Sequence, residues 1–314
     1  MKKVVKALLI AALGIGVATP IFAAESAGQA GAYLKMGVGA RALGMGSAFT
    51  AVANDSTAAF WNPAGLAKLK KHEASFMHAN LSDDRDYNFF NYAHVLNGND
   101  GKNNGTVALS HIRFGIDGIP ETREDPNNPG QPWLDGAGNV RIFSYFEDTE
   151  TNTFISYGRA VTDRFYAGLN LKYLKQKLFT NKANTMGLDF GLMYDCNDKT
   201  TVGLSVRDLG ESMDWDTNTG TKDDVPVTTT LGIAHKCNDK LLLSADLNKV
   251  QDMDVKLFCG AEYQIHDNVS LRVGSHDSDL TLGASFKLDT WRFDYSYADE
   301  TLGDAHRISA SKTF

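Results

Sequence analysis

The sequence predicts an all-β protein, an antiparallel transmembrane β-barrel of about fourteen strands with an N-terminal hatch inside its lumen. From residue 73 onward, apolar and polar residues alternate with a period of two over windows of about ten residues. The connections between these windows are alternately short and long, as at the two rims of a membrane barrel. After the first residues, no apolar run approaches the ~20 residues of a transmembrane helix.

The first residues have the pattern of a signal peptide. A basic stretch, Met1 to Lys6, precedes an apolar stretch, Ala7 to Ala18, and Ile21-Phe22-Ala23 supplies a cleavage site. We therefore expect residues 1–23 to be removed on export. The expected location of the mature chain is the outer membrane of a Gram-negative-type bacterium.

Residues 24–72 have no strand alternation and form the predicted hatch. Gly37, Gly39, Gly44 and Gly46 keep the backbone compact and permit positive φ. The stretch 61–66, WNPAGL, breaks the segment with a turn, because proline bars the preceding residue from helical dihedrals. A barrel of about fourteen strands has a lumen too wide for wall side chains to fill, so a plug or water must fill it. We expect residues 24–72 to be that plug.

Residues 73–314 form the predicted barrel. In residues 279–288, for example, Leu280 and Leu282 alternate with Thr281 and Gly283. The longest connections are 114–150 and 209–225. The predicted strands are 73–80, 87–95, 104–113, 151–161, 164–178, 183–194, 199–208, 226–236, 239–248, 254–265, 268–276, 279–288, 291–299 and 305–314.

A soluble β-sandwich or propeller also alternates, so alternation alone does not distinguish them from a membrane barrel. The polar face of the strands is rich in glycine and serine, such as Gly187, Gly191 and Ser285, whereas a solvent-facing sheet carries longer charged chains. Aromatic residues near strand ends, such as Tyr263 and Trp291, suit the two membrane interfaces. Both observations favour the membrane barrel.

The stretch LKMGVGARALGMGSAFTAVANDSTAAFWNPAGLAKL (34–69) resembles the N-terminal signature of the PorV/PorQ family of outer-membrane proteins. That family is similar to the FadL-type fatty-acid transporters, whose hatch carries an Asn-Pro-Ala motif matched here by Asn62-Pro63-Ala64. The resemblance implies a fourteen-stranded barrel with an internal hatch. It also implies either passage of a lipophilic substrate or delivery of exported proteins within type IX secretion.

The candidate binding or gating residues of the hatch are Arg41, Asn62, Pro63, Ala64 and Gly65. Arg41 needs a carboxylate if it is buried, because an unpaired buried charge is costly. Strand parity points four carboxylates inward. They are Asp189, Asp246, Glu262 and Asp294. We favour an ion-pair network that fixes the hatch, with ligand gating as the alternative.

Two further candidates lie in the barrel. A lateral gap is expected at Ile112, Phe114 and Gly115, where a glycine ends the third predicted strand before the longest loop. The alternative is that Gly115 only begins that loop. Phe314 ends an alternating strand, which resembles the assembly signal of outer-membrane barrels, and we expect it to act as one.

Composition and motifs narrow the function. A net charge of −7 without a basic stripe argues against nucleic acid. The three cysteines lack zinc or redox spacing, and no catalytic motif is visible, so we expect no enzyme, cofactor or metal site. The expected partners are the lipid bilayer, the barrel-assembly machinery, and a hydrophobic ligand or secretion-system proteins. Two functions follow: a barrel that binds or passes a ligand, or a sealed interaction subunit of a secretion complex.

Overall fold

The computed structural model describes residues 29–81, 85–97, 103–217, 220–299 and 304–314. The predicted signal peptide lies outside this range. Within it, no helix is long and apolar enough to cross a membrane.

Within the described residues, fourteen antiparallel strands close into a barrel, which confirms the predicted all-β barrel of about fourteen strands. Each strand pairs with the next along the chain, and the ring closes where the first strand pairs with the last. The strands are β1 (Glu73–Leu81), β2 (Arg85–Asn97), β3 (Asn103–Thr122), β6 (Ile142–Ala160), β7 (Phe165–Leu178), β8 (Asn181–Asn197), β9 (Thr200–Leu209), β12 (Thr228–Lys236), β13 (Leu241–Val250), β14 (Val255–His266), β15 (Val269–His276), β16 (Asp279–Leu288), β17 (Trp291–Ala298) and β18 (Ala305–Thr313).

The two faces of the wall differ because side chains alternate across a strand. On β16, the outward residues Leu280 and Leu282 are about half exposed, whereas Thr281 and Ser285 face inward and are buried. The same alternation places Phe293 outside and Asp294 inside on β17. The outer surface therefore carries apolar side chains, and the inner surface carries small and polar ones.

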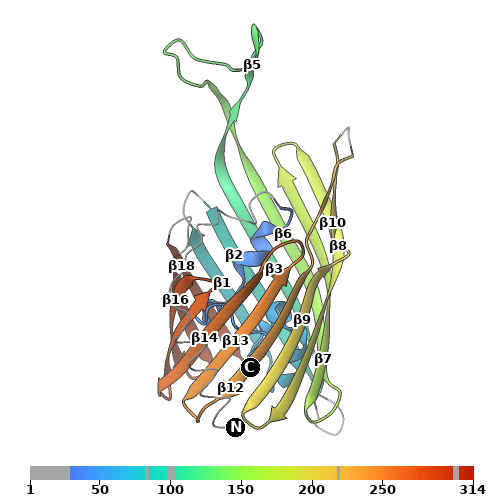
Figure 1. Ribbon diagram of the computed structural model, residues 1–314, viewed down its shortest axis with the longest axis vertical. Helices are drawn as coiled ribbons and strands as arrows, with labels where there is room; N and C mark the ends of the chain where they lie inside the picture. Colours follow the sequence, from blue (N-terminus) through green and yellow to red (C-terminus); the bar gives the residue numbers. More distant parts are fainter. Residues whose placement is uncertain (1–28, 82–84, 98–102, 218–219, 300–303) are drawn as a thin grey trace.

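The described residues hold four further, short strands. They are β4 (Glu124–Asp125), β5 (Asn128–Pro132), β10 (Ser212–Trp215) and β11 (Lys222–Asp224). Of these, β10 and β11 extend the sheet of the wall beside β8. β3 and β6 continue past the barrel as a two-stranded ribbon, residues 117–122 and 142–147, with β4 and β5 near its tip (Figure 1). The sequence had predicted a loop over 114–150, because these residues lack apolar alternation.

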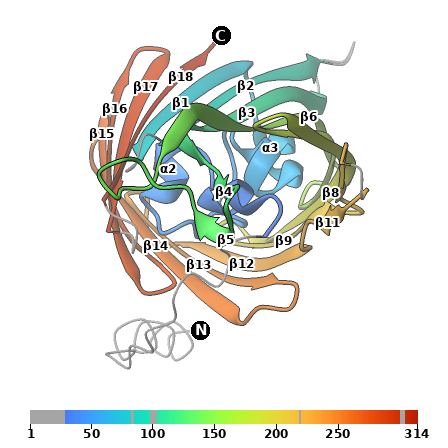
Figure 2. The same ribbon diagram turned by 90° about the horizontal axis from the view of Figure 1, so that it is seen from above.

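The N-terminal segment, residues 29–72, lies inside the ring of strands (Figure 2). It contains η1 (Ala32–Met36), α2 (Ala40–Leu43), α3 (Ala58–Trp61) and η2 (Pro63–Lys68). Val38, Ala48 and Phe49 have no exposed surface. The main hydrophobic core is formed by this segment and by inward apolar side chains of the wall.

Candidate functional site: the interface between the N-terminal segment and the barrel wall

Glycines of the wall let the N-terminal segment touch the strand backbone. A Cβ atom added to Gly168 on β7 would lie 2.2 Å from the carbonyl carbon of Pro63. One added to Gly274 on β15 would lie 2.2 Å from the backbone nitrogen of Gly46. Any larger residue at these positions would push the segment away, so the close packing requires glycine on the inner face of the wall.

The stretch around Asn62 anchors the segment to β8. Asn62 is fully buried, and its amide group donates to the carbonyl oxygens of Thr50 (2.9 Å) and Leu192 (3.1 Å). Its side-chain oxygen accepts from the backbone N–H of Ala64 (3.2 Å) and so caps the start of η2. Pro63 supplies the fixed φ of the first helical position.

Gly65 completes this turn by close approach. A Cβ there would lie 2.2 Å from the carbonyl oxygen of Ala53. Asn62, Pro63, Ala64 and Gly65 thus pack the segment against itself and the wall. Their role in binding or gating stays a prediction.

An ion-pair network holds the opposite side of the segment. The guanidinium of Arg41 donates two hydrogen bonds of 2.9 Å to Glu262 on β14 and one of 3.1 Å to Asp55. Bidentate pairs of this kind fix geometry as well as charge. Glu262, one of the four carboxylates predicted to face inward, also accepts from Nε of Arg272 (2.6 Å).

The network continues along the wall. Arg292 on β17 contacts both Asp55 (3.1 Å) and Asp294 (2.8 Å), and Arg272 reaches Asp294 at 3.1 Å. Although burial acts to raise the pKa of the Asp55 carboxyl, Arg292 and Arg41 together hold it below its ordinary value. Asp55 is therefore ionised at neutral pH, and three arginines alternate with three carboxylates between segment and wall.

The other two predicted inward carboxylates serve different contacts. Asp246 on β13 accepts the backbone N–H groups of Phe49 (3.0 Å) and Thr50 (2.9 Å). Asp189 on β8 lies 3.2 Å from the ammonium of Lys172, which Asp208 and Glu211 also contact. We call these four side chains the Lys172 cluster.

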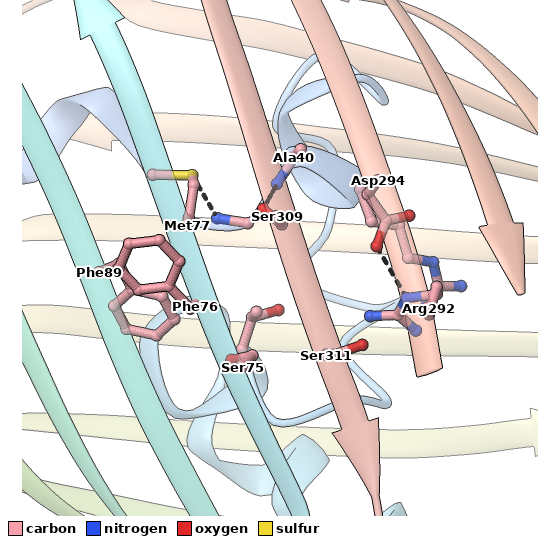
Figure 3. Close-up of a pocket in the computed structure, with 12 residues that line it drawn as sticks. Ala40, Ser75, Phe76, Met77, Phe89, Arg292, Asp294, Ser309 and Ser311 are labelled. Atoms are coloured by element: carbon pink, nitrogen blue, oxygen red, sulfur yellow. Dashed lines mark hydrogen bonds and ion pairs between the residues drawn. The ribbon is translucent and has the colours of Figure 1, made fainter. Parts of the chain in front are cut away.

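A small cavity lies between the segment and β1, β17 and β18. Figure 3 shows Ser309 beside Ala40 and Arg292 beside Asp294. The backbone N–H of Ala40 donates to the hydroxyl oxygen of Ser309 at 2.8 Å. The cavity measures about 10 Å³, roughly the size needed for one water molecule. This part of the interface is therefore closely packed.

A larger cavity of about 510 Å³ lies at the end of η2, on the rim with the short turns. It is lined by Lys68, Lys70, Val95, Asn97 and Tyr166, among others. Its position places it at the barrel mouth, beyond the packed interface.

The residues of the predicted lateral gap lie within paired strands, and their role in an exit stays a prediction. Ile112, Phe114 and Gly115 on β3 are paired on both sides, with β2 and with β6. Ile112 and Phe114 point inward and are buried, and Phe114 stacks on Tyr33 with ring centroids 6.1 Å apart. Apolar packing on the N-terminal segment therefore keeps this part of the wall closed.

An interruption of the wall lies instead between β8 and β9. Their register shifts between Leu188 and Phe190, and Asp208 opposite has a φ of 67°, in the left-handed region. Beyond this point β8 pairs with β10, through Ala183 and Asn184. The sequence did not predict the interruption, and the Asp208-Leu209-Gly210 triplet was its only local signal.

Phe314 lies at the end of the chain with its ring 57% exposed. Its N–H donates to the carbonyl oxygen of His72 (2.9 Å), and Lys312 lies over the ring at 5.2 Å. Its role in assembly stays a prediction.

Comparison with protein-family models gives no match, and neither does comparison with curated proteins. Solved structures are similar. The CymD monoaromatic hydrocarbon channel has a TM-score of 0.63 at 14% identity, over 89% of this chain and 98% of its own. The P. putida toluene transporter TodX has a TM-score of 0.57 at 14% identity, over 88% and 99%. A Pseudomonas aeruginosa FadL homologue has a TM-score of 0.56 at 14% identity, over 86% and 96%.

At this identity the likeness shows a shared fold. It agrees with the expected similarity to FadL-type barrels. The PorV/PorQ resemblance stays a prediction.

Proposed function

We propose that the chain is a non-catalytic outer-membrane channel for a hydrophobic small molecule, with the N-terminal segment acting as its hatch. The observation that carries the proposal is a closed barrel with an apolar outer surface and a lumen filled by the chain's own N-terminal segment. An apolar outer face on a closed sheet suits a bilayer, because no strand edge is left without a partner in lipid.

The filled lumen favours a hydrophobic ligand over an ion or a sugar. A packed segment leaves no wide aqueous path, so water-soluble solutes should pass poorly. A hydrophobic ligand has no need to cross the whole lumen, since leaving sideways into the bilayer keeps its apolar surface out of water. The interruption between β8 and β9 is the best candidate for such an exit among the described strands.

The structural comparisons support the same ligand class. CymD is described as a monoaromatic hydrocarbon channel and TodX as a toluene transporter, and both share this fold. We therefore take a monoaromatic hydrocarbon as the first probe.

Native purification tests the proposal. The protein should be isolated from its own membrane and the co-purifying lipids and proteins identified by mass spectrometry, followed by binding of toluene to the purified barrel. A bound lipophilic molecule and saturable toluene binding are the expected results. A barrel that binds neither would contradict a channel of this class.

A second candidate function is a sealed interaction subunit of a secretion complex, such as type IX secretion. The direct backbone contacts at Gly168 and Gly274 and the water-sized cavity favour it, because they leave little room for a ligand to pass. A stoichiometric protein partner in the same purification, without bound lipid, would support this function instead.

A further inference from the structure

The Lys172 cluster combines three carboxylates with one ammonium inside the barrel. Nζ of Lys172 lies 3.2 Å from Asp189 and 2.9 Å from Glu211, and it also contacts Asp208. The side chain of Glu211 lies against Gly187, where an added Cβ would be 2.1 Å from its Oε1. The three carboxylates come from β8, β9 and the connection that follows β9.

Burial makes the charge balance of this cluster costly. The side chains of Lys172, Asp189, Asp208 and Glu211 are 4%, 4%, 8% and 0% exposed. With all groups ionised, the cluster would carry two uncompensated negative charges away from water. Uptake of one proton by a carboxylate relieves much of that repulsion.

Glu211 is the one member of the cluster that lies in a connection, between β9 and β10. It follows Gly210, whose φ is 74°, and its carbonyl oxygen accepts from the N–H of Val225 (3.0 Å). Met213 and Val225 are buried in the same core cluster as Tyr33 and Leu34 of the N-terminal segment. Residues 208–217 and 220–225, which carry β10 and β11, are therefore docked on the N-terminal segment beside Glu211, and we call these described residues segment 208–225.

We propose that protonation of Glu211 keeps segment 208–225 docked in the barrel, and that ionisation of Glu211 releases it. The ionised carboxylate gains free energy by leaving Asp189 and Asp208 for water, and it takes the interior contacts of Met213 and Val225 with it. This switch lies where β8 changes partner from β9 to β10. It does not depend on which ligand, if any, passes through the barrel.

The surroundings support this assignment. Burial raises the pKa of Glu211 from 4.5 to about 7; Lys172 opposes the rise, while Asp208 and Asp189 add to it. Tyr33 and Lys35 of the N-terminal segment interact electrostatically with carboxylates of the cluster, and Glu150 on β6 interacts with Tyr33. A further positive charge near the cluster is that of Lys35, whose own pKa is lowered by burial.

The direction of the pH effect follows from linkage. Because the pKa is raised in the docked state, docking is strongest below pH 4.5, weakens as the pH rises toward 7, and changes little above 7. The two pKa values give about a 70-fold weakening of the docking equilibrium between pH 5 and pH 8.

Amide hydrogen exchange of the full chain in detergent micelles tests the switch. Exchange in peptides covering 208–217 and 220–225 should be measured at pH 5 and pH 8 and corrected for the intrinsic pH dependence of exchange. The wild type should lose tens-fold protection at pH 8. Glu211→Gln, which mimics the protonated side chain, should stay protected at both values. Glu147→Gln, an exposed carboxylate paired with Lys177, is the matched control and should behave like the wild type.

Equal pH profiles for the wild type and Glu211→Gln would overturn the proposal, as would unchanged wild-type protection. If Glu211→Gln does not fold into a heat-modifiable barrel, Asp208→Asn provides the second test. It removes one of the repelling charges and should reduce the loss of protection at pH 8. A loss of protection as large as that of the wild type would count against the switch.

Discussion

At the scale of single residues, the position of the N-terminal segment depends on a few charged and polar side chains. Arg41 joins the segment to β14 through Glu262, and Asp246 binds two of its backbone N–H groups from β13. Each contact links residues about 200 positions apart in the chain. These side chains therefore hold together two parts of the molecule that are distant in sequence.

Arg41→Ala should loosen the N-terminal segment. The substitution leaves Glu262 with Arg272 and Asp55 with Arg292, so each carboxylate keeps one partner. Breaking a buried pair typically costs about 3–5 kcal/mol, and the remaining partners place this variant near the lower end. Single-channel conductance in planar bilayers should rise above the wild-type level.

The matched control is Arg123→Ala, since Arg123 is 57% exposed and pairs only with Glu121 among the ion pairs of the described chain. It should conduct like the wild type. If Arg41→Ala also conducts like the wild type, Arg41 does not hold the segment closed.

Deletion of Phe314 should reduce the amount of barrel in the outer membrane. It should change the stability of the barrel that does form only slightly. Phe314 is more than half exposed, so its loss removes little packing. The measurement is the membrane level of the truncated chain, together with its heat-modifiable migration. Normal levels would argue against an assembly role.

At the scale of elements, the wall strands use glycine where the segment crosses them. β7 and β8 meet the turn at Pro63 through Gly168 and Gly191, and β14 and β15 meet Met45 and Gly46 through Gly260 and Gly274. The inner face of the barrel is thus shaped to fit one particular path of backbone.

Gly168→Ala should displace η2 from the wall. The added methyl would overlap the backbone of Pro63 and Ala64, which cannot rotate away, so we expect a cost of about 1–3 kcal/mol. Gly136→Ala is the matched control, because a Cβ there meets nothing within 4 Å. Thermal unfolding in detergent should show a lower midpoint for the first variant alone; equal midpoints would mean that the segment has room to move.

The membrane-facing strands could be predicted from the sequence, whereas the ribbon and most contacts of the interface could not. The window 279–288 coincides with β16, because its outward side chains are apolar and its inward ones are not. The third predicted strand ended at residue 113, whereas β3 runs to Thr122, since the ribbon lacks that contrast. For the site, parity placed Glu262 inside, but the contacts of Arg272 and Arg292 depend on register between strands, which alternation does not specify.

At the scale of the whole molecule, the apolar outer surface and the projecting ribbon define two environments. Leucine, phenylalanine and tyrosine side chains cover the outside of the barrel, while the tip of the ribbon carries Asp125, Asn128 and Asp135. A molecule with this surface fits a bilayer with the ribbon outside it.

The whole chain should migrate as a heat-modifiable barrel, with the tip of the ribbon, residues 123–141, accessible at the cell surface. A single cysteine at Ala137, near the ribbon tip, should react with a membrane-impermeant thiol reagent on intact cells. One at Asp163, in a short turn on the opposite rim, should react only after lysis. A mature chain found soluble in the periplasm or medium would contradict the membrane barrel.

The hydrogen bond from Ala40 to Ser309 has a consequence for the order of folding. These two residues are 269 positions apart, so the N-terminal segment reaches its final place only when the last strand is present. Contacts of such long sequence separation are slow to form, because the intervening chain must be ordered first. Closure of the ring and seating of the N-terminal segment should therefore occur as one late event. A chain that lacks β18 would leave both ends of the sequence without their partners.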